Sequence, residues 1–283
     1  MKQNVNIWED IGVSEVIGFI LILALMTMGI GLVGLYGYPQ LLQEQSNANF
    51  KNMERNIIVI QNDMKSLVYK SVPYQETSMQ ISGGSLSVIN PNPPPPTGLL
   101  GQSYFTIHGS VTGDIPFDGV GGTVLEFYPG LLQFESDSNN GIIGLQNGAV
   151  VTNGFSETGG STMLSEPRWY LDDVAATRTL VITMIQITSA DALSKNGIGT
   201  VQMGVSELYD LQDIDLTANP ETIDIKYFDV EDGYNTAWQN YFKDTQVFTT
   251  DAPNPCTVSG STLTIPGVTR LVIKTYKVEI LSL

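Results

Sequence analysis

Cysteine and histidine are almost absent from this chain of 283 residues. The one cysteine, Cys256, excludes a disulfide within the chain. The one histidine, His108, gives little support to a histidine-rich metal site or a histidine-based catalytic triad. No G-x-S-x-G, P-loop, zinc or Asn-x-Ser/Thr glycosylation pattern occurs either. We therefore expect no enzyme activity, no cofactor and no bound metal.

Basic residues are also scarce, with 13 Lys and Arg against 29 Asp and Glu and a net charge of −16. Residues 73–283 hold 23 of the acids and 8 of the bases, so a net −15 lies there. Negative charge repels nucleic-acid phosphates and anionic lipids. The charge predicts solubility and no nucleic-acid partner, with acid-dependent ligand binding as the alternative.

A long apolar run, Val13–Tyr38, has no charged residue between Glu15 and Glu44. About 20 apolar residues suffice for a helix to span a bilayer. The run has no polar face, which disfavours a buried helix of a soluble protein. A cleaved secretory signal would have a basic start and a shorter apolar region. We interpret the run as a retained membrane helix.

Glycines recur every three residues at the end of this run, at Gly31, Gly34 and Gly37. Small residues let membrane helices approach closely, but glycine also loosens a helix, and the spacing leaves both interpretations open. Pro39 lacks an N–H and is expected to kink or interrupt the helix.

An apolar stripe follows Pro39, with successive spacings of 3, 4, 3, 4 and 3 residues. This period is typical of a helix that packs along one face. The packing partner is the chain's own head, neighbouring subunits or both. The stripe consists of Phe50, Met53, Ile57, Ile60, Met64 and Leu67.

The string GVSEVIG at residues 12–18, directly before the apolar run, resembles the N-terminus of archaeal type IV pilin-like proteins. GYP at residues 37–39 and GGSLSV at residues 83–88 also resemble an uncharacterised pilin-like family of archaea. The resemblance implies that a prepilin peptidase cuts a leader between Gly12 and Val13. Family leaders place Lys or Arg before the cut, whereas this chain has Glu9 and Asp10.

The resemblance also implies an organisation into a leader (1–12), a transmembrane and assembly helix (13–72) and an extracellular head (73–283). Subunits would leave the membrane and polymerise into a cell-surface filament through bundled helices, served by an assembly ATPase and membrane platform. Glu15 would pair with the new α-amino group, while the three glycines and the apolar stripe would pack the bundle. The alternatives are a non-polymerising anchored binding protein or minor pilin and, with least support, an anchored extracellular hydrolase.

The head is predicted to be rich in short strands, which gives an α+β fold class with a mostly antiparallel sandwich or barrel-like head. Asn147-Gly148 is a strong type I′ hairpin signal. The segment 179–187 is apolar on both faces and should form a central strand. A short helix is expected at 235–243. The other expected strands are 85–89, 104–108, 123–128, 131–134, 142–145, 149–152, 200–208, 222–228, 262–265 and 271–281.

Acidic groups at 210–215 and 229–232 match a calcium loop only in part, and solvated turns are the simpler interpretation. The aromatic residues Trp169, Tyr170, Trp238, Tyr241 and Phe242 could form a sugar-stacking surface. Core packing explains them more simply.

Overall fold

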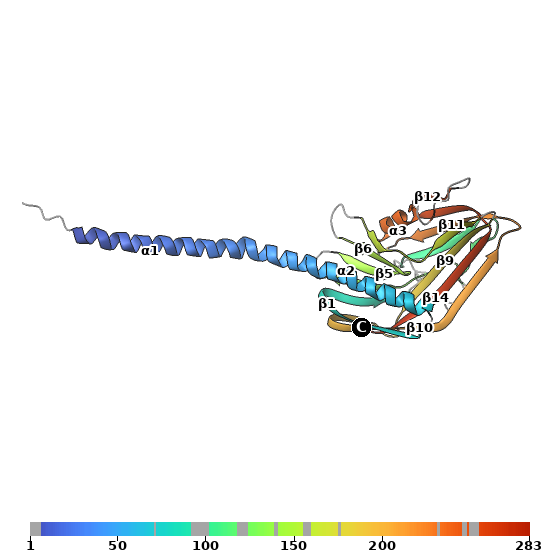
Figure 1. The fold of residues 1–283 in the computed structure, drawn as a ribbon, viewed down its shortest axis with the longest axis horizontal. Coiled ribbons are helices and arrows are strands. Elements are labelled where there is room, and N and C mark those ends of the chain that lie inside the picture. The colour runs from blue at the N-terminus through green and yellow to red at the C-terminus, as the bar shows by residue number, and fades with distance from the viewer. Residues whose placement is uncertain are drawn as a thin grey trace, which may run out of the picture. The chain divides into compact units, whose positions relative to one another are not determined.

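The computed structural model describes residues 7–70, 72–91, 102–117, 124–138, 141–154, 160–174, 177–230, 233–244, 248 and 255–283, with backbone only at 7–14 and 206–209 (Figure 1). The chain divides into two compact units, Met1–Ala48 and Asn49–Leu283. The boundary falls inside a helix, so the second unit contains the last part of that helix together with the head.

The N-terminal helical run consists of α1 (Ile7–Leu32), a π-helical segment η1 (Val33–Gly37) and α2 (Tyr38–Lys70). It begins before the expected boundary at Val13. The prediction that Pro39 interrupts the helix is wrong in its simple form, because α-helix continues from Tyr38. The perturbation is η1, in which the Tyr38 N–H donates to the Val33 carbonyl. In a regular α-helix, the Pro39 ring would clash with the backbone carbonyl four residues before it. The wider turn of η1 changes the hydrogen-bond pattern at this point of the helix.

A nine-stranded sheet forms the middle layer of the Asn49–Leu283 unit, in the order β7-β6-β5-β4-β1-β10-β14-β9-β8. All its pairs are antiparallel except β14 with β9. Its strands are β1 (Tyr74–Ile89), β4 (Leu131–Ser136), β5 (Ile142–Gln146), β6 (Ala149–Asn153), β7 (Thr162–Ser165), β8 (Tyr170–Val174), β9 (Thr177–Thr188), β10 (Ser194–Asp215) and β14 (Arg270–Ser282).

A five-stranded antiparallel sheet, in the order β12-β13-β11-β2-β3, forms a second layer. The helix α3 (Asn235–Phe242) packs into the core between the sheets. The strands are β2 (Tyr104–Gly109), β3 (Gly113–Ile115), β11 (Glu221–Phe228), β12 (Thr257–Ser259) and β13 (Thr262–Val268).

The core between the two sheets is rich in aromatic rings. Phe105 of β2 lies 4.8 Å from Trp238 of α3 and 5.8 Å from Trp169, measured between ring centroids. The Trp169 indole N–H donates to the Thr183 carbonyl at 2.7 Å. Trp169, Trp238, Tyr241 and Phe242 are all buried, so core packing explains these four aromatics. Tyr170, the fifth aromatic of the predicted group, is 46% exposed and lies outside this core.

The other face of the nine-stranded sheet is covered by the C-terminal part of α2. Its apolar stripe packs on side chains from β1, β4, β5, β9, β10 and β14. One polar side chain lies inside this interface: Gln61 is fully buried and donates to the carbonyls of Gly148 at 2.6 Å and Glu166 at 3.2 Å. A buried polar group needs such partners, so these two bonds favour one register of helix on sheet.

Several strand predictions are confirmed. The Asn147-Gly148 turn joins β5 to β6 with positive φ at both residues, as a type I′ turn requires. β9 is buried on both faces, as its sequence predicts. The α+β class with a largely antiparallel head is confirmed, and the parallel β14–β9 pair is the exception.

The predicted strand 123–128 is wrong over its described residues. Val124 and Phe127 each make only an isolated bridge, and Leu125 and Glu126 between them lie in a bend. Pro129 follows and has no N–H to continue a ladder. β3, β7, β8 and β12 were not predicted, because three to five residues carry little periodic signal.

The α2–sheet interface predicts a sharp contrast between neighbouring residues. Ile60 is fully buried and Val59 is 47% exposed. Ile60→Ala should lower the free energy of unfolding by about 2–5 kcal/mol, because it leaves a cavity. Val59→Ala should change it by less than about 0.5 kcal/mol. Urea denaturation of both full-length variants in detergent, followed by tryptophan fluorescence, measures the difference, and equal effects would contradict this packing.

Candidate functional site: the exposed apolar helix and the head

The apolar helix exposes its side chains along its first half. From Glu15 to Ala48 the described side chains are exposed, apart from half-buried Gly18 and Ser46. Phe19 is 68% exposed and Tyr36 74%. Soluble monomers rarely expose apolar patches of this extent. Among the described helices, this N-terminal helix alone is long and apolar enough to cross a membrane. A signal sequence would have the same length and apolar composition.

Polar side chains in this half of the helix bond locally. The Thr27 hydroxyl lies 3.0 Å from the carbonyls of both Leu23 and Ala24, to which it donates. Gln40 Nε2 donates to Glu44 Oε1 at 3.4 Å. Such internal bonding suits an apolar solvent, where an unmet hydrogen bond is costly.

The predicted assembly glycines have no close neighbour across the helix among the described residues. A Cβ at Gly31 or Gly34 would meet nothing within 4 Å, and one at Gly37 would meet only Val33 Cγ1 at 3.6 Å. Gly34 and Gly37 lie in the π-helical segment η1. Because a π-helix has a wider turn than an α-helix, these two glycines do not lie on the single face that an α-helix would give them.

The predicted processing site lies within α1, because helix runs from Ile7 through Gly12 and Val13. The side chains of these two residues fall outside the described ones. Glu15, the first described side chain, is exposed.

The apolar stripe of α2 is buried in its own chain. Met53, Ile57, Ile60, Met64 and Leu67 are 0–1% exposed against the nine-stranded sheet. Phe50 is half-buried, with its ring centroid 6.3 Å from that of Phe134. The five stripe residues from Met53 to Leu67 therefore offer no surface to a neighbouring subunit. The sequence pattern alone did not show whether the stripe packs on its own head or on a neighbour.

Three of the acidic side chains that resembled calcium ligands have partners in the chain, whereas Oδ2 of Asp210 is buried without a hydrogen-bond partner among the described residues. Asp213 pairs with Arg270, with Nη2 to Oδ2 at 2.5 Å. Asp215 accepts from the backbone N–H and hydroxyl of Thr217. Asp229 accepts from the backbone N–H groups that lead into α3. Glu231 and Asp232 lie outside the described residues, and no group of three metal-ligating side chains occurs among the described ones.

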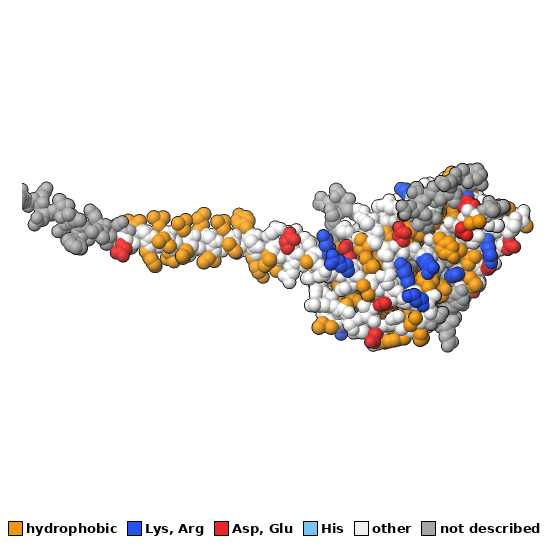
Figure 2. All heavy atoms as spheres, in the orientation of Figure 1, with side chains coloured by type: hydrophobic (Ala, Val, Ile, Leu, Met, Phe, Trp, Pro, Cys, Tyr) orange, Lys and Arg blue, Asp and Glu red, His pale blue; other side chains and the backbone are white. Residues whose placement is uncertain are grey.

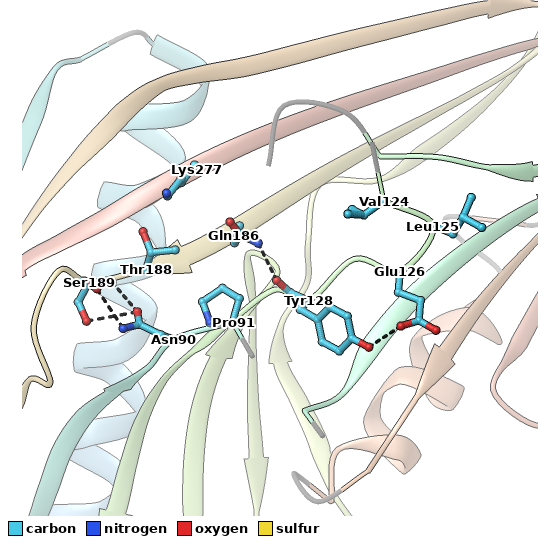
Figure 3. A pocket seen from close by; sticks show the side chains of 10 residues that line it. All are labelled: Asn90, Pro91, Val124, Leu125, Glu126, Tyr128, Gln186, Thr188, Ser189 and Lys277. Carbon is cyan, nitrogen blue, oxygen red and sulfur yellow. Dashed lines mark hydrogen bonds between the residues drawn. The ribbon is translucent and has the colours of Figure 1, made fainter. Parts of the chain in front are cut away.

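A pocket of about 760 Å³ opens where β1, β9 and β14 meet the segment 124–128 (Figure 3). Its polar groups bond to one another: Tyr128 donates to Glu126 at 2.5 Å, and Gln186 donates to the Tyr128 carbonyl at 3.1 Å. Burial and the bond to Glu126 raise the pKa of Tyr128. The lining offers hydroxyls, amides, a carboxylate and Lys277, a set suited to binding a polar molecule. Sequence analysis missed it because its segments lie far apart in the chain.

Glu221 is a buried carboxylate that closes a turn. It is 3% exposed and accepts from the Thr112 hydroxyl at 2.5 Å and from the backbone N–H groups of Thr112 and Val111 at 2.9 and 3.0 Å. Burial favours a higher pKa of Glu221, but these hydrogen bonds outweigh it and lower the pKa below the usual value. The group therefore fixes the turn between β2 and β3.

A lowered pKa makes stability depend on pH. The ionised Glu221 stabilises the fold above the unfolded-state pKa of about 4.3, and this contribution is lost as pH falls through the lower folded-state pKa. Glu221→Gln should therefore lower the free energy of unfolding at pH 7. Near pH 2 the free energy of unfolding of this variant should approach the wild-type value. Urea denaturation across this range tests it, with the exposed Glu135→Gln as control. A pH-independent deficit would contradict the assignment.

These observations define a class of protein: an N-terminal helix exposed along its apolar half, joined to a β-rich head. The chain belongs to a family of unknown function (DUF7289), whose profile matches residues 12–281. No curated protein and no solved structure matches the chain.

Proposed function

We propose that the chain is a structural subunit of an archaeal type IV pilus-like surface filament. The observation that carries the proposal is the exposed apolar segment of the helix, which requires an apolar environment that the chain does not supply. A bilayer supplies it before assembly, and the helices of neighbouring copies supply it in a filament. The VSEVIG string at residues 13–18 adds the resemblance to pilin-like N-termini.

Each part of the chain has a role in this proposal. A prepilin peptidase removes residues 1–12, and the family match begins at residue 12, next to this cut. Glu15 then pairs with the α-amino group of Val13 in its own or a neighbouring subunit. A cytoplasmic ATPase and membrane platform drive assembly, by analogy with such systems. The role is structural, without catalysis, cofactor or nucleic acid.

A permanently anchored surface-binding protein, or a minor subunit, is the second candidate. The pocket of about 760 Å³ favours it, because small-molecule sites have volumes of about 300–1,000 Å³. In this case the helix stays in the membrane and the head binds a ligand. A hydrolase has the least support, since the described residues that line the pocket include no histidine or cysteine and no serine–base pair.

Removal of the exposed apolar segment distinguishes the two candidates. A truncated chain starting at Gln40 keeps the helix residues that pack on the head and should be a soluble monomer. Full-length protein freed of detergent should form filaments, because burial of apolar area contributes about 25 cal/mol per Å². Light scattering and electron microscopy in one buffer compare the two chains.

The mass of the subunit in native filaments should correspond to an N-terminus at Val13. Ordered filaments from the truncated chain would show that head contacts drive assembly. Full-length protein that stays in membranes and is absent from native filaments would favour the anchored binding protein.

A further inference from the structure

The pocket of about 760 Å³ lies on the side of the nine-stranded sheet that faces the five-stranded sheet. Ile273 of β14 and Met184 of β9 belong to the core between the two sheets. Side chains alternate along a strand, so Lys277, Gln186 and Thr188 point to the same side. Lys277 lies directly opposite Gln186. These three side chains line the pocket, and we call them its floor (Figure 3).

Several polar atoms on this side of the sheet are buried without a hydrogen-bond partner among the described residues. One is Oγ1 of Thr188 in the floor. Three more are Thr275 Oγ1, Asp210 Oδ2 and Gln212 Nε2. Thr275 lies two residues before Lys277 on β14, and Asp210 is directly opposite Thr275 on β10. Buried polar groups are hydrogen-bonded as a rule, so a bound molecule that supplies partners here would stabilise the floor.

The charges around the pocket are mixed, as they are over the face of the head that Figure 2 shows. The described lining holds one carboxylate, Glu126, and one ammonium group, Lys277. Two further carboxylates lie beside the floor, Asp210 on β10 and Glu279, which is directly opposite Thr188. Carboxylates in excess repel phosphates, sulfates and other anions. A ligand without net charge suits this balance better.

The rest of the lining combines polar groups with an apolar edge. Asn90 and Ser189 supply an amide and a hydroxyl, and hydrogen bonds between these two residues hold them in place. Val124 and Leu125 are 39% and 50% exposed and offer apolar contact. A sugar ring has hydroxyl groups that donate and accept around its edge and apolar C–H groups on its faces. The lining therefore matches the chemistry of a sugar.

We propose that this pocket binds a neutral carbohydrate, either a single sugar or the end of a glycan chain. Its hydroxyl groups bond to the floor at Gln186, Thr188 and Lys277, and its C–H face lies against Val124 and Leu125. The volume is in the range of small-molecule sites, about 300–1,000 Å³. The inference goes beyond the proposed filament and concerns the head alone, so it does not depend on polymerisation.

Saturation-transfer NMR of full-length protein, in a zwitterionic detergent without a sugar headgroup, tests the proposal. The probes are glucose, galactose, mannose and N-acetylglucosamine. At least one of them should bind with a Kd on the order of 1 mM, as expected for so small a ligand. No binding of any of the four at about 10 mM would overturn the proposal.

The variant Thr188→Val separates ligand binding from folding. It replaces a hydroxyl that has no partner in the described chain by a methyl group, so the urea midpoint should stay at or above the wild-type value. The affinity for the sugar should fall about fivefold, because one hydrogen bond to the ligand is lost. Lys277→Met removes a charged donor and should lower the affinity about tenfold.

The matched control is Thr179→Val, the same substitution on the other side of β9. Its sugar affinity should stay within about twofold of wild type, because Thr179 points away from the pocket. Equal affinities of Thr188→Val and this control would overturn the proposal. Binding of alanine, a zwitterion, without binding of any of the four sugars would also overturn it and would identify a charged small molecule as the ligand.

Discussion

The packing of the last part of α2 on the nine-stranded sheet is the contact on which the rest of the structure depends. Five stripe side chains, from Met53 to Leu67, are 0–1% exposed there. Burial of such a side chain contributes about 1.5–3 kcal/mol. Together they approach the whole net stability of a typical domain, about 5–15 kcal/mol. The helix is therefore part of the head's core, and Gln61 favours its register with two hydrogen bonds.

The N-terminal half of the same helix packs on none of the described parts of the head. From Val16 to Leu42 it exposes large apolar side chains, and a Cβ at Gly31 or Gly34 would meet no described atom within 4 Å. The core of the head therefore holds one end of the helix, while the other end is apolar and exposed. This division suits a subunit that exchanges one apolar environment for another while its head stays folded, and it suits a permanent anchor equally well.

The parts of the fold that were predictable from sequence depend on local patterns. The 3–4 spacing of the stripe predicts a buried helix face, Asn147-Gly148 predicts a hairpin, and the apolar 179–187 predicts a two-sided strand. The parallel pairing of β9 with β14 has no local signal, because it joins two segments that are far apart in the sequence, Thr177–Thr188 and Arg270–Ser282. The pocket was missed for the same reason, because Asn90, Tyr128 and Lys277 line one cavity only in the folded chain.

The most direct test of the central claim compares truncated chains that start at Gln40 and at Pro73. The first keeps the stripe, and the second removes it and uncovers one face of the nine-stranded sheet. Urea denaturation should show one cooperative transition for the chain starting at Gln40. It should show no cooperative transition, with binding of a hydrophobic dye, for the chain starting at Pro73. The same urea midpoint for both would contradict the account.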